Sequence, residues 1–79
     1  MKLSQLDGKR IAVVLEGRQA ETVVRGRASF VADEDLGDCL RVSLSGTPGS
    51  PDFFFPESAE EYEFELDWRY GCDYAVTVR

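Results

Sequence analysis

The sequence contains no histidine, and it has only two cysteines, Cys39 and Cys72. The missing histidine removes the usual general base, the Ser–His and Cys–His nucleophile pairs and the commonest zinc ligand. The two cysteines lie 33 positions apart without C-x-x-C spacing, so they are expected to be reduced, small apolar side chains. We therefore expect that the protein is not an enzyme and that it holds no cofactor and no metal ion.

Long apolar runs are also missing. The longest uncharged apolar stretch covers residues 11–15, which is far too short to cross a bilayer. The first residues carry no apolar run of signal-peptide length. These features predict a cytoplasmic protein without membrane contact, and no pattern points to a small-molecule substrate.

The remaining composition is that of one small globular domain covering residues 1–79. Of these residues 43% are hydrophobic and 30% are charged. A chain of this size buries only about 60% of the surface that its unfolded form exposes, so the core is thin. Five Phe, three Tyr and one Trp supply its largest side chains.

Hydrophobic residues alternate with polar ones along most of the chain, which is the pattern of β-strands. We expect an all-β fold, a small barrel or two-sheet sandwich of five to six mainly antiparallel strands. One short helical turn is predicted near the N-terminus, at Leu3-x-x-Leu6, and another could begin at Ser58, before Glu61. Gly26 and Ala28 indicate a bend or close packing in the second strand. The expected strands are residues 11–15, 22–32, 39–44, 53–55, 61–68 and 74–78.

The register of the last hairpin can be predicted from the rule that directly opposite residues share a face of the sheet. A three-residue loop at residues 70–72 sets Trp68 opposite Tyr74 and Leu66 opposite Val76. This register makes Trp68 and Tyr74 anchors of the core.

Charge is distributed unevenly along the chain. Residues 1–32 carry six basic and three acidic side chains, whereas residues 33–79 carry three basic and twelve acidic ones. One interpretation is that the acidic row in the fifth strand lies beside a strand carrying Arg25 and Arg27, which would balance it. The other is an acidic surface that meets a basic partner. The acidic row consists of Glu61, Glu63, Glu65 and Asp67.

Phe53, Phe54 and Phe55 form the most conspicuous apolar cluster. In a strand Phe53 and Phe55 share one face and Phe54 takes the other, and Pro51 and Pro56 favour an edge strand. At least one ring then leaves the core unless another segment covers it. The cluster is either a strand buried on both faces or an aromatic interaction patch.

These patterns lead to two hypotheses about function. The first is a protein-interaction module that binds a basic protein surface or a second copy of itself. Its contact residues are Phe53, Phe54, Phe55, Glu61, Glu63, Glu65 and Asp67. The alternative is a nucleic-acid-binding small β-barrel that uses Arg18, Arg25, Arg27 and Arg41. The excess of acidic residues makes nucleic acid the less favoured partner, because affinity for it comes largely from Lys and Arg.

Overall fold

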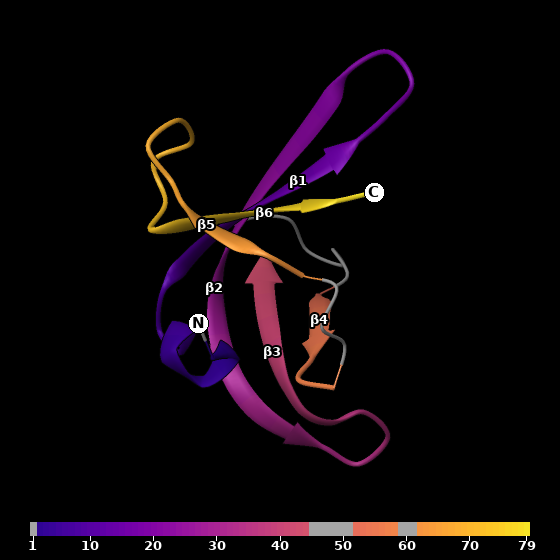
Figure 1. Cartoon of the computed structure of the whole chain (residues 1–79), viewed down its shortest axis with the longest axis vertical. Helices are drawn as coiled ribbons and strands as arrows, with labels where there is room; N and C mark the ends of the chain where they lie inside the picture. The colour runs from indigo at the N-terminus through magenta and orange to yellow at the C-terminus, as the bar shows by residue number, and fades with distance from the viewer. Residues whose placement is uncertain (1, 45–51, 59–61) are drawn as a thin grey trace.

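Six strands and one short helical turn make up the fold in the computed structural model, which describes residues 2–44, 52–58 and 62–79. The predicted all-β class is confirmed (Figure 1). The predicted turn at Leu3-x-x-Leu6 is also confirmed, whereas the one before Glu61 falls outside the described residues. The elements are η1 (Leu3–Leu6), β1 (Arg10–Glu16), β2 (Glu21–Asp33), β3 (Gly37–Leu44), β4 (Phe53–Pro56), β5 (Phe64–Leu66) and β6 (Tyr74–Val78).

All six strands belong to one mixed sheet with the order β4-β3-β2-β1-β6-β5. Four of the five neighbouring pairs are antiparallel, as predicted, and β1 with β6 is the parallel pair. Within the described residues the sheet does not close into a barrel. Neither the barrel nor the two-sheet sandwich is therefore confirmed.

Strand β2 is long and bent, and it joins the two halves of the sheet. Its first part pairs with β1 and its second part with β3, so that Gly26 has a partner on each side. Figure 1 shows β2 curving from the β1–β2 hairpin toward β3. A Cβ atom at Gly26 would lie 2.5 Å from the backbone oxygen of Ser43. The predicted close packing at Gly26 is confirmed, because only the missing side chain lets β3 approach this closely.

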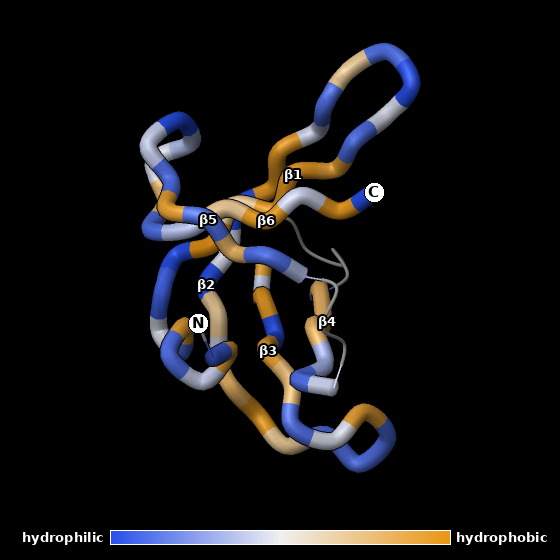
Figure 2. Tube along the Cα trace, in the orientation of Figure 1, coloured by the Kyte–Doolittle hydropathy of each residue, from blue (hydrophilic) through white to orange (hydrophobic). Residues whose placement is uncertain are grey.

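The core fills the inner face of the bent sheet. Leu6, from the helical turn η1, is fully buried in it. Two backbone hydrogen bonds of 2.8 Å hold that segment against β2: Gly8 N–H donates to Ala28 O, and Ala28 N–H donates to Lys9 O. In Figure 2 apolar segments lie along β1, β3 and the end of β2, and most of the turns are polar. The buried cluster consists of Leu6, Ile11, Val13, Ala28, Leu40, Val42, Phe55 and Val76.

The three consecutive phenylalanines lie on β4, which is an edge strand as predicted. Phe55 is 2% exposed and packs edge to face against Tyr62 and Phe64, with ring centroids 4.7 and 5.3 Å away. Phe53 is half-buried against the same cluster. Phe54 points to the other face opposite Arg41 and is 39% exposed. Two of the three rings therefore belong to the core.

The predicted register of the last hairpin is wrong by two residues. Phe64 lies opposite Val76 and Leu66 opposite Tyr74, and β5 ends at Leu66. A shift of two residues leaves every side chain on its expected face, so face matching could not detect it. Trp68 lies beyond the strand and is 84% exposed, which corrects its predicted place in the core. Leu66 is 76% exposed.

The different burial of Phe54 and Phe55 predicts different costs of substitution. Phe55→Ala should lower the free energy of unfolding by about 3–5 kcal/mol, because it leaves a cavity against Tyr62 and Phe64. Phe54→Ser should cost less than about 1 kcal/mol. Urea unfolding of both variants measures the difference, and equal losses would contradict the placement of the two rings.

Candidate functional site

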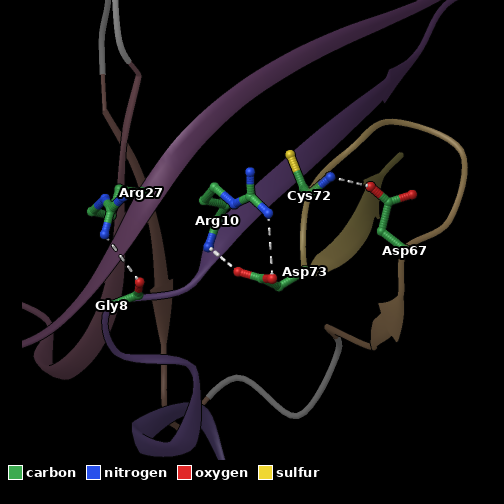
Figure 3. Close-up of polar contacts among 6 residues, drawn as sticks. All are labelled: Gly8, Arg10, Arg27, Asp67, Cys72 and Asp73. Carbon is green, nitrogen blue, oxygen red and sulfur yellow. Dashed lines mark hydrogen bonds and ion pairs between the residues drawn. The ribbon is translucent and has the colours of Figure 1, made fainter.

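Residues 67–73 form a compact loop between β5 and β6 that is organised by one carboxylate. Asp67 Oδ1 accepts hydrogen bonds from the backbone N–H groups of Arg69 and Tyr70, at 2.8 and 3.0 Å. Its Oδ2 accepts the N–H of Cys72 at 2.8 Å (Figure 3). Gly71 supplies the left-handed backbone conformation that the loop needs, with a φ of +76°. Strand β5 ends before Asp67, because the carboxylate of this residue hydrogen-bonds to backbone N–H groups of the loop that follows and so stabilises a turn in place of a strand.

The same contacts set the ionisation of Asp67. Partial burial raises the pKa of this carboxyl, but the backbone N–H donors of Tyr70, Cys72 and Arg69 outweigh burial and hold the pKa below its ordinary value. Asp67 is thus a charged structural group that faces its own loop. Its place in an acidic partner-binding row stays a prediction, and in the structure the carboxylate is engaged by its own loop.

A second carboxylate, that of Asp73, joins the loop to β1. Its Oδ2 accepts the backbone N–H of Arg10 at 2.9 Å, and its own N–H donates to Arg10 O at 2.9 Å. The Arg10 guanidinium also lies 3.7 Å from Asp73 Oδ1 (Figure 3). The bond from the Arg10 N–H and the charge of Arg10 hold the pKa of Asp73 below its ordinary value. These bonds sit where the parallel pairing of β1 and β6 begins.

The loop lies over the outer face of the sheet and carries the most exposed aromatic ring among the described residues. Arg25, on β2, donates from Nε to the backbone oxygen of Tyr70 at 2.8 Å, which ties the loop to the sheet. The Arg69 guanidinium lies 5.3 Å from the Trp68 ring centroid and 5.9 Å from that of Tyr70, within cation–π range. Trp68 is therefore held outward on a loop with a defined shape.

A groove of about 560 Å³ runs beside this loop on the outer face. Val14 and Ala75 contribute to its floor from β1 and β6, and the loop and the acidic segment at β5 form its sides. Among the described residues neither Glu63 nor Glu65 forms an ion pair. The lining residues are Val14, Glu21, Tyr62, Glu63, Glu65, Arg69, Tyr70, Ala75, Thr77, Val78 and Arg79.

The arginines of β2 and the glutamate of β5 lie on strands that are not neighbours. One row across the sheet runs from Arg25 through Ala12 and Ala75 to Glu65, on four successive strands. Three strand spacings put the backbones of Arg25 and Glu65 roughly 14 Å apart. The Arg25 side chain reaches from β2 to the backbone oxygen of Tyr70, and among the described residues it forms no ion pair with Glu65. The expectation that Arg25 and Arg27 lie beside the acidic strand is wrong, because β1 and β6 intervene.

The structure separates the residues of the predicted contact surface. Phe55 and Phe53 serve the core, and Phe54 is partly exposed at the β4 edge. Glu63 and Glu65 are exposed along the groove at the opposite end of the strand order, and Glu61 lies outside the described residues. Sequence reasoning missed Leu66, Trp68, Arg69 and Tyr70 as surface features. An aspartate followed four residues later by glycine was the available signal for a loop.

Both cysteines are free thiols. Burial raises the pKa of Cys39, and nearby Asp33 and Asp38 raise it further. Burial and Asp67 raise the pKa of Cys72 more than Arg25 and Arg10 lower it. Both side chains are therefore protonated at neutral pH, without the thiolate character of a nucleophile.

The acidic turn between β2 and β3 has a structural role for one of its carboxylates. Asp33 Oδ1 accepts the backbone N–H groups of Asp35 and Leu36, at 2.8 and 3.0 Å.

Over residues 2–44, 52–58 and 62–79, no group of three or more acidic or cysteine side chains is placed to hold a metal ion. In the same part of the chain no helix has the length and apolarity needed to cross a bilayer.

The role of Asp67 predicts a pH-dependent effect of its substitution. Because its pKa is lower in the folded than in the unfolded chain, the stability that it adds is complete above its ordinary pKa and is lost as the pH falls through its folded pKa. Asp67→Asn should therefore destabilise the protein at neutral pH and progressively less as the pH falls below about 4.

Urea unfolding at neutral pH and at about pH 3 measures this dependence. Asp35→Asn, on the exposed β2–β3 turn, is the control with the same loss of charge. An Asp67→Asn effect that does not shrink on acidification would show that the carboxylate charge does not hold the loop.

No family model, no curated protein and no solved structure matches this chain. The basis for a function is therefore the geometry of the loop, the groove and the charged residues of the outer face.

Proposed function

We propose that the protein is a small protein-interaction module that receives a basic, extended segment of a partner protein in the groove beside β5. One observation carries the proposal: Glu63 and Glu65 are exposed along this groove and form no ion pair with any described residue. Complementary charge on a partner would supply specificity and speed up association. The acidic strand predicted from the sequence thus keeps its role through these two residues.

The shape of the groove favours an extended basic segment. The partly exposed Ala75 and Val78 in its lining offer apolar surface for the stems of Lys or Arg side chains, whose charged ends would reach the carboxylates. Strand β5 is the last strand in the sheet order, so within the described residues no strand lies along its second edge. An extended peptide can add to such an edge through backbone hydrogen bonds.

A basic partner is favoured over a second copy of the chain. The protein carries a net charge of -6, and two copies meeting through this groove would bring Glu63 and Glu65 against like charges. Phe54 stays in the proposal as a partly exposed ring at the β4 edge that a partner could cover. Three further expectations stay predictions: that the protein is not an enzyme, that it uses no cofactor and that it lies in the cytoplasm.

Selection of random displayed peptides on the immobilised protein tests the proposal. We expect the selected peptides to be rich in Lys and Arg. Their affinity should fall at least roughly tenfold for Glu63→Lys/Glu65→Lys, because two attractive contacts become repulsive. The control is Glu34→Lys/Asp35→Lys, which makes the same charge change on the exposed β2–β3 turn.

Two results would contradict the proposal. One is a selection without enrichment of basic residues, and the other is equal loss of affinity in the groove variant and the control. Sedimentation equilibrium in the same buffers should show a monomer, and a dimer that is lost with Glu63→Lys/Glu65→Lys would favour self-association instead.

A further inference from the structure

Three arginines gather on the outer face where β1 and β2 lie side by side, and we call them the arginine patch: Arg10, Arg25 and Arg27. Arg10 and Arg27 are direct partners in the ladder, and Arg25 lies two residues from Arg27 on the same face. Directly opposed like charges destabilise a sheet, because they repel across a short distance. The arrangement therefore costs stability unless an anion balances it.

Little negative charge from the chain itself reaches this patch. Arg10 pairs with Asp73 at 3.7 Å, but Arg25 donates to the neutral backbone oxygen of Tyr70. Arg27 reaches only the backbone oxygen of Gly8, at 3.4 Å (Figure 3). In the described part of the chain neither Arg25 nor Arg27 has a carboxylate partner.

The exposed ring of Trp68 belongs to the loop that is fastened to this patch. Arg25 holds the loop at Tyr70, and Arg69 lies over the Trp68 ring. The two carboxylates in the loop are occupied, since Asp67 binds three backbone N–H groups and Asp73 binds Arg10. Arg69 and Arg25 thus bring two guanidinium groups to the loop that carries Trp68, where Asp67 is the neighbouring charged carboxylate.

We propose that the arginine patch and Trp68 form a binding site for single-stranded nucleic acid, in which the guanidinium groups hold phosphates and the indole ring stacks on a base. Guanidinium groups suit phosphate because they are planar, permanently charged and able to donate two hydrogen bonds at once. Arg25 and Arg27 lie roughly 7 Å apart along β2, which separates them enough to hold neighbouring phosphates. An exposed aromatic ring beside basic residues stacks unpaired bases with little sequence preference.

The Trp68 ring favours single-stranded over double-stranded nucleic acid. In a duplex the bases are already stacked and paired, so Trp68 would contribute nothing and only the arginines would bind. The glutamates of the groove do not occupy these arginines, because among the described residues neither Arg25 nor Arg27 forms an ion pair with Glu63 or Glu65. This site uses different residues from the groove proposed for a basic protein segment, and the two proposals stand or fall separately.

A fluorescence titration tests the site directly, since Trp68 is the one tryptophan of the chain. An oligo(dT) strand should quench it in a saturable manner, and anisotropy of the same strand carrying a dye should give the same affinity. Three phosphate contacts predict a slope of log affinity against log salt of about −2. A duplex of equal length should bind more weakly and without the quenching that stacking causes.

Matched variants separate the parts of the site. Arg27→Glu should weaken binding and reduce the magnitude of the salt slope by at least about 0.7, whereas Arg18→Glu, the same change in the exposed β1–β2 hairpin loop, should leave both nearly unchanged. Trp68→Ala should weaken binding of the dye-labelled strand roughly tenfold. Glu63→Lys/Glu65→Lys should still bind the strand, whatever it does to binding of a basic peptide.

Three outcomes would overturn the proposal. The first is no saturable binding at low salt, and the second is equal effects of Arg27→Glu and Arg18→Glu. The third is that heparin or the duplex binds as tightly as the single strand while Trp68→Ala has no effect, which would reduce the site to a general polyanion surface. Circular dichroism of each variant confirms that a loss of binding is not a loss of fold.

Discussion

Strand β6 lies parallel to β1, and Asp73 fixes this arrangement by bonding to the backbone of Arg10 through both its carboxylate and its N–H. Parallel neighbours cannot be joined by a tight turn, so β6 has to enter beside β1 from elsewhere in the chain. It enters from the short hairpin with β5, whose loop is organised by Asp67. Two aspartates thus set the position of the last third of the molecule.

The charge pattern of the outer face follows from this strand order. Because β1 and β6 separate β2 from β5, the arginines of β2 and the glutamates near β5 are not on neighbouring strands, and among the described residues no ion pair joins them. The small residues Ala12 and Ala75 occupy the row between them. A chain with a net charge of -6 thereby presents three arginines together on β1 and β2 and two exposed glutamates along the groove beside β5.

Much of the fold could be predicted because alternation of apolar and polar residues is a local signal. It located most of the strands and the opposite facing of Phe54 and Phe55, although it extended the fifth strand to residue 68 whereas β5 ends at Leu66. The flanking prolines predicted the edge position of β4, and the missing side chain of Gly26 predicted the close approach of β3. The strand order could not be predicted, because no local pattern states that residue 76 lies beside residue 13. The hairpin register failed because face matching cannot distinguish registers that differ by two residues. That one error placed Trp68 in the core and Asp67 on the surface.

Nuclear Overhauser contacts in the isotope-labelled protein test the strand arrangement most directly. The account predicts contacts between Val13 and Val76 across the parallel pair and between Phe64 and Val76 across the hairpin, with none between the Trp68 indole and the Tyr74 ring. Contacts of the Trp68 indole with the Tyr74 ring, as direct cross-strand partners, would contradict it. Such contacts would place Trp68 in the core, and they would exclude both the outward position of the loop and the proposed site beside the arginine patch.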